Sequence, residues 1–89
     1  MKKRAFLTGI EGQDGSYLAE LLLANNYEVH GTFRPSSNGG SPNLKPLKSR
    51  PQSTLEALFL HPADLDDPES IRLPLERCAP DEVYHLASQ

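Results

Sequence analysis

The chain has 89 residues, of which 37% are hydrophobic and 24% are charged, and its formal net charge is −3. A chain of this length can form one small domain that buries only about 60–65% of the surface of the unfolded chain. The mildly acidic balance argues against a nucleic-acid-binding surface, and no apolar run is long enough to span a membrane. The single cysteine, Cys78, excludes an internal disulfide framework and fits a reducing compartment, so we expect a cytoplasmic protein. No histidine or second cysteine lies at metal-ligand spacing from Cys78, and no metal site is predicted.

The first predicted elements are a strand, a glycine loop and a helix within residues 5–24. Residues 5–7, Ala-Phe-Leu, are a short apolar run that is typical of a buried parallel strand. Three glycines follow at a spacing of three, Gly9, Gly12 and Gly15, and leucines and alanines then recur at helical spacing. A glycine loop between a strand and a helix is the context that a dinucleotide-binding site requires.

Each glycine of the loop has a predicted role. Gly9 can make the tight turn out of the strand, Gly12 lets the backbone approach a pyrophosphate, and Gly15 lets the helix pack close to the sheet. The helix N-terminus would then present its N–H groups to the phosphates. Three glycines at this spacing also fit a packing turn that binds nothing. A P-loop is excluded because Ser16 occupies the position of the phosphate-binding lysine.

Residues 8–20 resemble the first turn of the GDP-mannose 4,6-dehydratases, a family of extended short-chain dehydrogenase/reductases. The sequence Gly-Gln-Asp-Gly-Ser-Tyr-Leu at residues 12–18 is typical of this branch. By this resemblance Gln13 and Asp14 join the three glycines at the cofactor. Glu11 departs from the family, which usually has a small residue there, often threonine. A carboxylate beside a pyrophosphate is repulsive, so Glu11 would weaken cofactor binding unless its side chain points to solvent.

The second strand is predicted at residues 28–33, which are rich in β-branched and aromatic side chains. NAD-specific Rossmann units carry an acid about twenty residues past the glycines, where it binds the ribose 2′-OH. This strand ends Thr32-Phe33-Arg34 with no acid at that end. Arg34 can pair with a 2′-phosphate, so NADP is favoured over NAD. A solvated arginine at a strand end is the alternative. Pro35 replaces a basic residue of the family's Arg-Arg-Ser-like sequence and would weaken this clamp.

Residues 35–53 are rich in Ser, Pro, Gly, Asn and Lys, and we predict a long loop there. Lys45, Lys48 and Arg50 give this segment a local basic excess. The resemblance implies that the loop reaches a neighbouring subunit and helps to enclose its cofactor, so the complete protein is expected to be a homo-oligomer. A mobile solvated loop is the alternative.

The third strand is predicted at residues 57–61, with Pro62 at the exit of the strand or at a sheet edge. Asp64 and Leu65 after it resemble the family's Asp-Leu pair. In that family the Asp accepts a hydrogen bond from the adenine amino group and the Leu packs on the ring. His61 is expected to be structural because no partner for acid–base work stands near it in the sequence.

A second long helix is predicted to begin after Asp67, which would cap it, and to run to about Arg77. Pro68 fits its first position. Pro74 lies inside the helix and should kink or shorten it, since proline costs roughly 3 kcal/mol in a helix interior.

The fourth strand is predicted at residues 82–87. Residues 86–89, Leu-Ala-Ser-Gln, resemble the family's Leu-Ala-Ala-Gln. By this resemblance the backbone of Leu86 and Ala87 lines the far side of the cofactor crevice.

The order of these elements predicts an α/β fold, with a Rossmann-like parallel sheet of order 3-2-1-4 and right-handed crossovers. The first and fourth strands then flank the switch point at which a dinucleotide lies. We expect residues 1–89 to be the N-terminal part of one NADP-binding domain, with the remainder of that domain and a substrate domain absent.

No catalytic residue is assigned within the chain. Enzymes of this superfamily use a Tyr-x-x-x-Lys pair in which the lysine lowers the pKa of the tyrosine. None of the three tyrosines, Tyr17, Tyr27 and Tyr84, has a lysine four residues later. We therefore expect the 89 residues alone to be inactive.

The resemblance implies the NADP-binding segment of an enzyme that converts GDP-mannose to GDP-4-keto-6-deoxymannose. Such an enzyme oxidises the sugar at C4, eliminates water across C5–C6 and returns the hydride at C6. Another sugar-nucleotide epimerase or dehydratase of the same superfamily is an alternative, because cofactor loops discriminate substrates poorly. A non-catalytic NADP-binding module is the other alternative.

Overall fold

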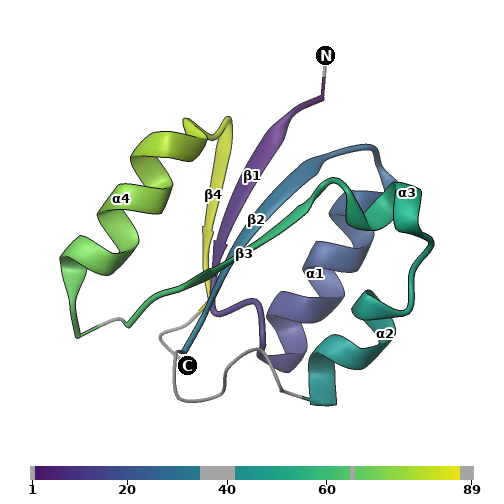
Figure 1. Cartoon of the computed structure of the whole chain (residues 1–89), viewed down its shortest axis with the longest axis horizontal. Helices are drawn as coiled ribbons and strands as arrows, with labels where there is room; N and C mark the ends of the chain where they lie inside the picture. The colour runs from purple at the N-terminus through teal and green to yellow at the C-terminus, as the bar shows by residue number, and fades with distance from the viewer. Residues whose placement is uncertain (1, 35–41, 65, 87–89) are drawn as a thin grey trace.

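The computed structural model describes residues 2–34, 42–64 and 66–86. Within them, four parallel strands form one sheet of order β3-β2-β1-β4 (Figure 1). The strands are β1 (Arg4–Thr8), β2 (Glu28–Phe33), β3 (Leu58–Pro62) and β4 (Glu82–His85). The predicted α/β fold and strand order are confirmed.

Helices cover both faces of the sheet (Figure 1). One face is covered by α1 (Gln13–Ala24) and α2 (Lys45–Lys48), and the other by α4 (Pro68–Cys78). Two short elements, η2 (Pro42–Leu44) and α3 (Gln52–Leu55), complete the path from β2 to β3. The chain moves one way along the sheet from β1 to β3 and returns to β4, so right-handed crossovers place α1 and α4 on opposite faces.

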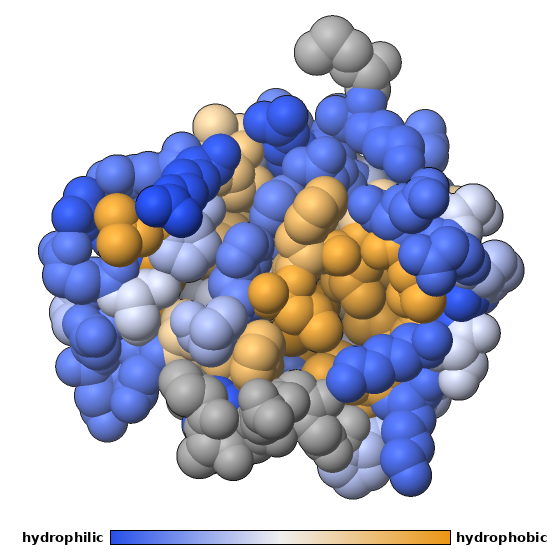
Figure 2. All heavy atoms as spheres, in the orientation of Figure 1, coloured by the Kyte–Doolittle hydropathy of each residue, from blue (hydrophilic) through white to orange (hydrophobic). Residues whose placement is uncertain are grey.

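The main core lies between the sheet and α1. Ala5, Leu7 and Val29 from the strands meet Ala19 and Leu22 from the helix, and all five are buried. Alternation along β1 and the helical spacing in α1 bring these side chains to one interface. Figure 2 shows apolar atoms gathered between β3 and the helices α1 and α2, within a largely polar surface.

The segment predicted as a loop, residues 35–53, is more structured than expected. Its described part contains η2, α2 and the start of α3. Leu44 and Leu47 are 0% and 1% exposed and belong to the core cluster. A single helical turn is too short to show periodicity, so the sequence pattern missed it. The basic excess is also partly engaged within the chain, because Arg50 pairs with Glu20 of α1.

The other element boundaries agree closely with the prediction. The third strand is shifted by one residue and includes Pro62, which β3 tolerates because it is an edge strand. Asp67 caps α4 as predicted, since its Oδ1 accepts a hydrogen bond from Glu69 N at 3.2 Å. Pro74 does not shorten α4, which continues to Cys78.

Arg72 supports the helix on both sides of the proline. It bonds Glu69 at 2.6 Å and Glu76 at 2.8 Å. Pairs spaced by three and four residues stabilise a helix by a few tenths of a kcal/mol each, about 0.2–0.5. These pairs help to offset the backbone hydrogen bond that Pro74 cannot donate.

Candidate functional site

A cleft of about 590 Å³ lies at the carboxyl ends of the strands, where the glycine loop meets the segments that follow β2 and β3. All the predicted cofactor residues that the structure describes line it: Gly9, Gly12, Gln13, Asp14, Gly15, Arg34, Asp64 and Leu86. Two further predicted residues, Leu65 and Ala87, lie outside the described residues. Residues that come from four separate parts of the chain are thus brought to one cleft.

The glycine loop makes a tight turn out of β1. Gly9 has a φ of 77°, in the left-handed region that favours glycine. Its N–H donates to Thr32 Oγ1 at 3.0 Å, and its carbonyl accepts from Gly12 N at 3.1 Å. Ile10 N donates to Thr32 O at 3.0 Å, which ties the loop to the end of β2. Sequence reasoning assigned the turn to Gly9 but did not assign Thr32, its partner.

Gly12 and Gly15 differ in what surrounds them. A Cβ atom at Gly15 would lie 2.3 Å from the Gly9 carbonyl oxygen and 2.9 Å from Ile10 Cα, so no side chain fits there. A Cβ atom at Gly12 would make only an ordinary contact, 3.5 Å from the same oxygen. Gly15 is therefore required by the packing of the loop on α1, whereas the fold itself does not require a glycine at position 12.

The first turn of α1 opens onto the cleft. Gly12 is its N-cap and provides no side-chain cap, while Gln13, Asp14 and Gly15 line the cleft. Helix N-termini carry unpaired N–H groups and the positive end of the helix dipole, so they attract anions. Asp14 adds one negative charge to this turn.

Glu11 does not point to solvent, which was the orientation that would keep its carboxylate away from a bound pyrophosphate. Its side chain is only 10% exposed. Glu11 Oε1 accepts hydrogen bonds from Arg34 N at 3.0 Å and Arg34 Nε at 3.2 Å. The Arg34 side chain is 79% exposed and lines the same cleft. The structure therefore joins the residue that departs from the family to the residue predicted to read the 2′-phosphate.

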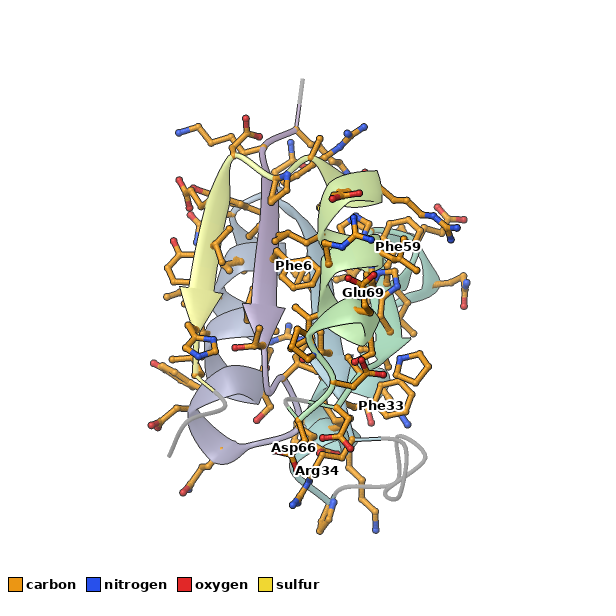
Figure 3. All side chains as sticks on the ribbon, turned by 90° about the vertical axis from the view of Figure 1, so that its left-hand side faces the viewer. Phe6, Phe33, Arg34, Phe59, Asp66 and Glu69 are labelled. Atoms are coloured by element: carbon orange, nitrogen blue, oxygen red, sulfur yellow. The ribbon has the colours of Figure 1, made fainter. Side chains whose placement is uncertain are left out.

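The segment after β3 also lines the cleft, through Asp64 and Asp66. Asp64 Oδ1 accepts a hydrogen bond from Asp66 N at 2.9 Å, and Asp64 N donates to Ser70 Oγ at 2.9 Å. Figure 3 shows Arg34 and Asp66 at the same end of the sheet, away from Phe6 and Phe59. Sequence reasoning did not assign Asp66, since only the Asp-Leu pair before it matched a motif.

The ends of β1 and β4 are joined at the switch point. Thr8 Oγ1 lies 2.8 Å from His85 Nδ1 and accepts a hydrogen bond from Leu86 N at 3.2 Å. These bonds fix the backbone of Leu86 beside the glycine loop. No local pattern in the sequence could reveal the pairing, because 77 residues separate Thr8 from His85.

His61 lies outside the residues that line the cleft and takes part in a stack on the α4 face of the sheet. Its Nε2 lies 3.0 Å from Nδ1 of His30, whose Nε2 is 2.7 Å from Glu28 Oε2. The His30 ring stacks on Phe59 with centroids 4.6 Å apart. Burial, and secondarily His30, lower the pKa of His61 below its usual value. The structure thus gives His61 a partner, His30, that the sequence did not reveal, and the structural role of His61 stays a prediction.

Two further findings concern the described part of the chain. It contains no group of three or more histidine, cysteine or acidic side chains placed to hold a metal ion. None of its helices is long and apolar enough to cross a membrane.

Comparison with known proteins identifies the family. The family model described as GDP-mannose 4,6 dehydratase matches residues 6–89. The chain belongs to the GDP-mannose 4,6-dehydratase family. It is 48% identical over 89 residues to GDP-mannose 4,6 dehydratase 2 of Arabidopsis thaliana, covering 99% of this chain and 24% of that protein. It is 44% identical over 89 residues to the GDP-mannose 4,6-dehydratase of Vibrio cholerae, covering 100% of this chain and 24% of the relative.

The chain thus spans about a quarter of the length of the curated dehydratases that it matches. Among solved structures, it resembles the Bordetella bronchiseptica enzyme WbmH in complex with NAD+, with a TM-score of 0.71 and 26% identity. That match covers 100% of this chain and 27% of WbmH. Membership of the GDP-mannose 4,6-dehydratase family confirms the resemblance found in the sequence.

Proposed function

We propose that this chain is the NADP-binding portion of a GDP-mannose 4,6-dehydratase. The observation that carries the proposal is the cleft, which the glycine loop, the start of α1 and Arg34 line together. The cleft lies at the carboxyl ends of parallel strands, beside the point where the strand order reverses. Ligands of open α/β sheets bind at this position. Family membership supports the sugar-nucleotide chemistry.

The pyrophosphate would lie against Gly12 and the first turn of α1. Gly12 is exposed and has no Cβ, so the backbone can approach a ligand there. The N–H groups of Gln13, Asp14 and Gly15 are at the positive end of the α1 dipole, where a phosphate is stabilised. Gly9 and Gly15 shape the turn that presents these groups.

The adenosine half would lie between Arg34 and the segment after β3. Arg34 would pair with the 2′-phosphate, which makes NADP the proposed cofactor. Asp64 would accept a hydrogen bond from the adenine amino group, with Leu65 against the ring. On the far side of the cleft, the backbone of Leu86 and Ala87 would line the crevice.

With NADP bound, the complete protein would oxidise GDP-mannose at C4, eliminate water across C5–C6 and return the hydride at C6. This chain's part is to bind and orient the cofactor, and we assign no catalytic residue to it. We propose that residues 1–89 belong to one NADP-binding domain, and that the rest of that domain and a substrate domain supply a Tyr-x-x-x-Lys pair. We further propose that the complete protein is a cytoplasmic homo-oligomer.

The reaction is tested by assaying the complete natural protein that carries these residues with GDP-mannose and NADP. We expect GDP-4-keto-6-deoxymannose as the product. The 89 residues expressed alone should form none, because no tyrosine here has a lysine four residues on. Product from an intact, uncontaminated 89-residue chain would contradict the assignment of catalysis to other residues. Absence of product from the complete protein would contradict the proposed activity.

The cofactor assignment is tested by replacing Arg34. Arg34→Ala should weaken NADP binding by roughly 1–3 kcal/mol, the scale of a lost hydrogen bond to a charged group, and leave NAD binding nearly unchanged. Calorimetric titration with both cofactors measures the two effects. Equal losses for NADP and NAD would show that Arg34 does not bind the 2′-phosphate.

A further inference from the structure

Glu11 is a loop residue whose carboxylate reaches the end of a different element. From the glycine loop it extends to the carboxyl end of β2, where Oε1 accepts bonds from the backbone and the Nε of Arg34 at 3.0 Å and 3.2 Å. The carboxylate is nearly buried, at 10% side-chain exposure. A charge withdrawn from water must be compensated by strong hydrogen bonds, and a backbone N–H with a guanidinium provides them. The contact is therefore a built feature of the cleft.

The position of this carboxylate bears on cofactor choice. NAD-selective Rossmann units place an acid at the end of the second strand, where it binds the ribose 2′-OH. Here the carboxyl end of β2 is Phe33, which Arg34 follows, so the strand supplies no acid at that end. Glu11 brings a carboxylate to the same end of β2, within hydrogen-bond distance of the Arg34 backbone. Both Glu11 and Arg34 line the cleft.

We propose that Glu11 is a selectivity residue that limits the preference of this site for NADP over NAD. The inference rests on the proposed function, because it assumes that the cleft binds a dinucleotide. A 2′-phosphate paired with the Arg34 guanidinium lies a few ångströms from the Glu11 carboxylate, and the two negative groups repel each other. The repulsion lowers the affinity for NADP by about tenfold, on the scale of charges near a protein surface. NAD has no 2′-phosphate and escapes this repulsion.

The test is Glu11→Gln in the complete natural protein, with dissociation constants for NADP and NAD measured by calorimetry. Glutamine keeps the shape of the side chain and a carbonyl oxygen that can accept the Arg34 N–H, so the fold is retained. Thermal unfolding verifies this. We expect the affinity for NADP to rise by about tenfold and the affinity for NAD to change by less than twofold.

Glu20→Gln is the matched control. Glu20 also pairs with an arginine, Arg50, but it lies on α1 outside the residues that line the cleft. Glu20→Gln removes one negative charge, as Glu11→Gln does. We expect the ratio of the NADP and NAD affinities to stay at the wild-type value. A shift of equal size in both variants would mean that net charge, not the position of Glu11, sets the ratio, and would overturn the proposal.

The remaining outcomes separate this inference from the proposed function. If Arg34→Ala weakens NADP binding but Glu11→Gln leaves NADP affinity unchanged or lowers it, Glu11 only positions Arg34. The selectivity role is then wrong and the cofactor site stands. If the wild-type protein binds neither cofactor, the proposed function is wrong and the inference falls with it.

Discussion

The corner formed by β1, the glycine loop and α1 differs sharply from the opposite side of the sheet, where α4 lies (Figure 1). In the corner, Leu7 and Ile10 are fully buried, and α1 buries five of its residues. The α4 helix buries only Cys78. On its side Val83 is 57% exposed. The residues that shape the cleft are thus held by dense packing, and the weakly packed part of the chain lies away from them.

The difference also appears in how each side is held together. The corner depends on backbone contacts that leave no space, as the 2.3 Å separation between a Cβ at Gly15 and the Gly9 carbonyl shows. On the α4 side, exposed ion pairs of Arg72 support the helix, and such pairs contribute little. A site that must hold a ligand in a fixed geometry is better placed on the closely packed corner.

The largest effect is expected from Gly12→Val. This variant tests whether the free space beside Gly12 is where a ligand binds. The fold should survive, because position 12 has an extended backbone and only an ordinary contact at a Cβ. A branched side chain would occupy the space in which we propose that the pyrophosphate lies. We expect NADP binding to become undetectable by calorimetry while thermal unfolding changes little. Normal NADP binding would show that the loop is only a packing turn.

Gly15→Ala tests the position in the same loop where no space is left for a side chain. The new methyl group would lie 2.3 Å from a backbone oxygen, so the loop and α1 must separate. Overpacking of this kind costs about 3 kcal/mol of unfolding free energy, measured by urea denaturation. Gly12→Ala is the matched control, and replacing a glycine N-cap by alanine should cost about 1 kcal/mol or less. Equal losses would mean that the two glycines do not differ as the structure indicates.

Hydrogen exchange of the 89-residue chain tests the contrast between the two sides directly. Amides in β1, β2 and the buried face of α1 should exchange slowest, because they open only with the whole chain. Amides of α4 should exchange first, because this helix buries so little. Mass spectrometry of peptic fragments resolves the two groups. Protection of α4 equal to that of α1 would contradict the comparison.

The smallest effect is expected from pH, through His61 on the α4 face. Its pKa is lowered in the folded chain, mainly by burial, so the unfolded chain binds more protons. Folding stability therefore falls as pH decreases from above the unfolded value, near 6.5, through the lower folded value. We expect His61→Gln to reduce the loss of stability between about pH 8 and pH 5 in urea titrations. An unchanged loss would assign the pH dependence to other groups.

The sequence alone was sufficient to predict the fold and most of the residues that line the cleft. The predicted strand order is confirmed because each βα unit is marked by local patterns: a short apolar run, helical spacing and the glycines between them. The same logic placed Gly9, Gly12, Gly15 and Arg34 at one edge, since the carboxyl ends of parallel strands meet there.

Only the tertiary structure decided the contacts made across the chain. It pairs Glu11 with Arg34, 23 residues away, and joins Thr8 to His85 across 77 residues. It also buries Leu47 on a helix of one turn. Local patterns determine which face of a strand or helix is apolar, but they do not determine where a loop side chain points. The direction of the Glu11 side chain depends on the end of β2, which packs against the glycine loop only in the folded chain.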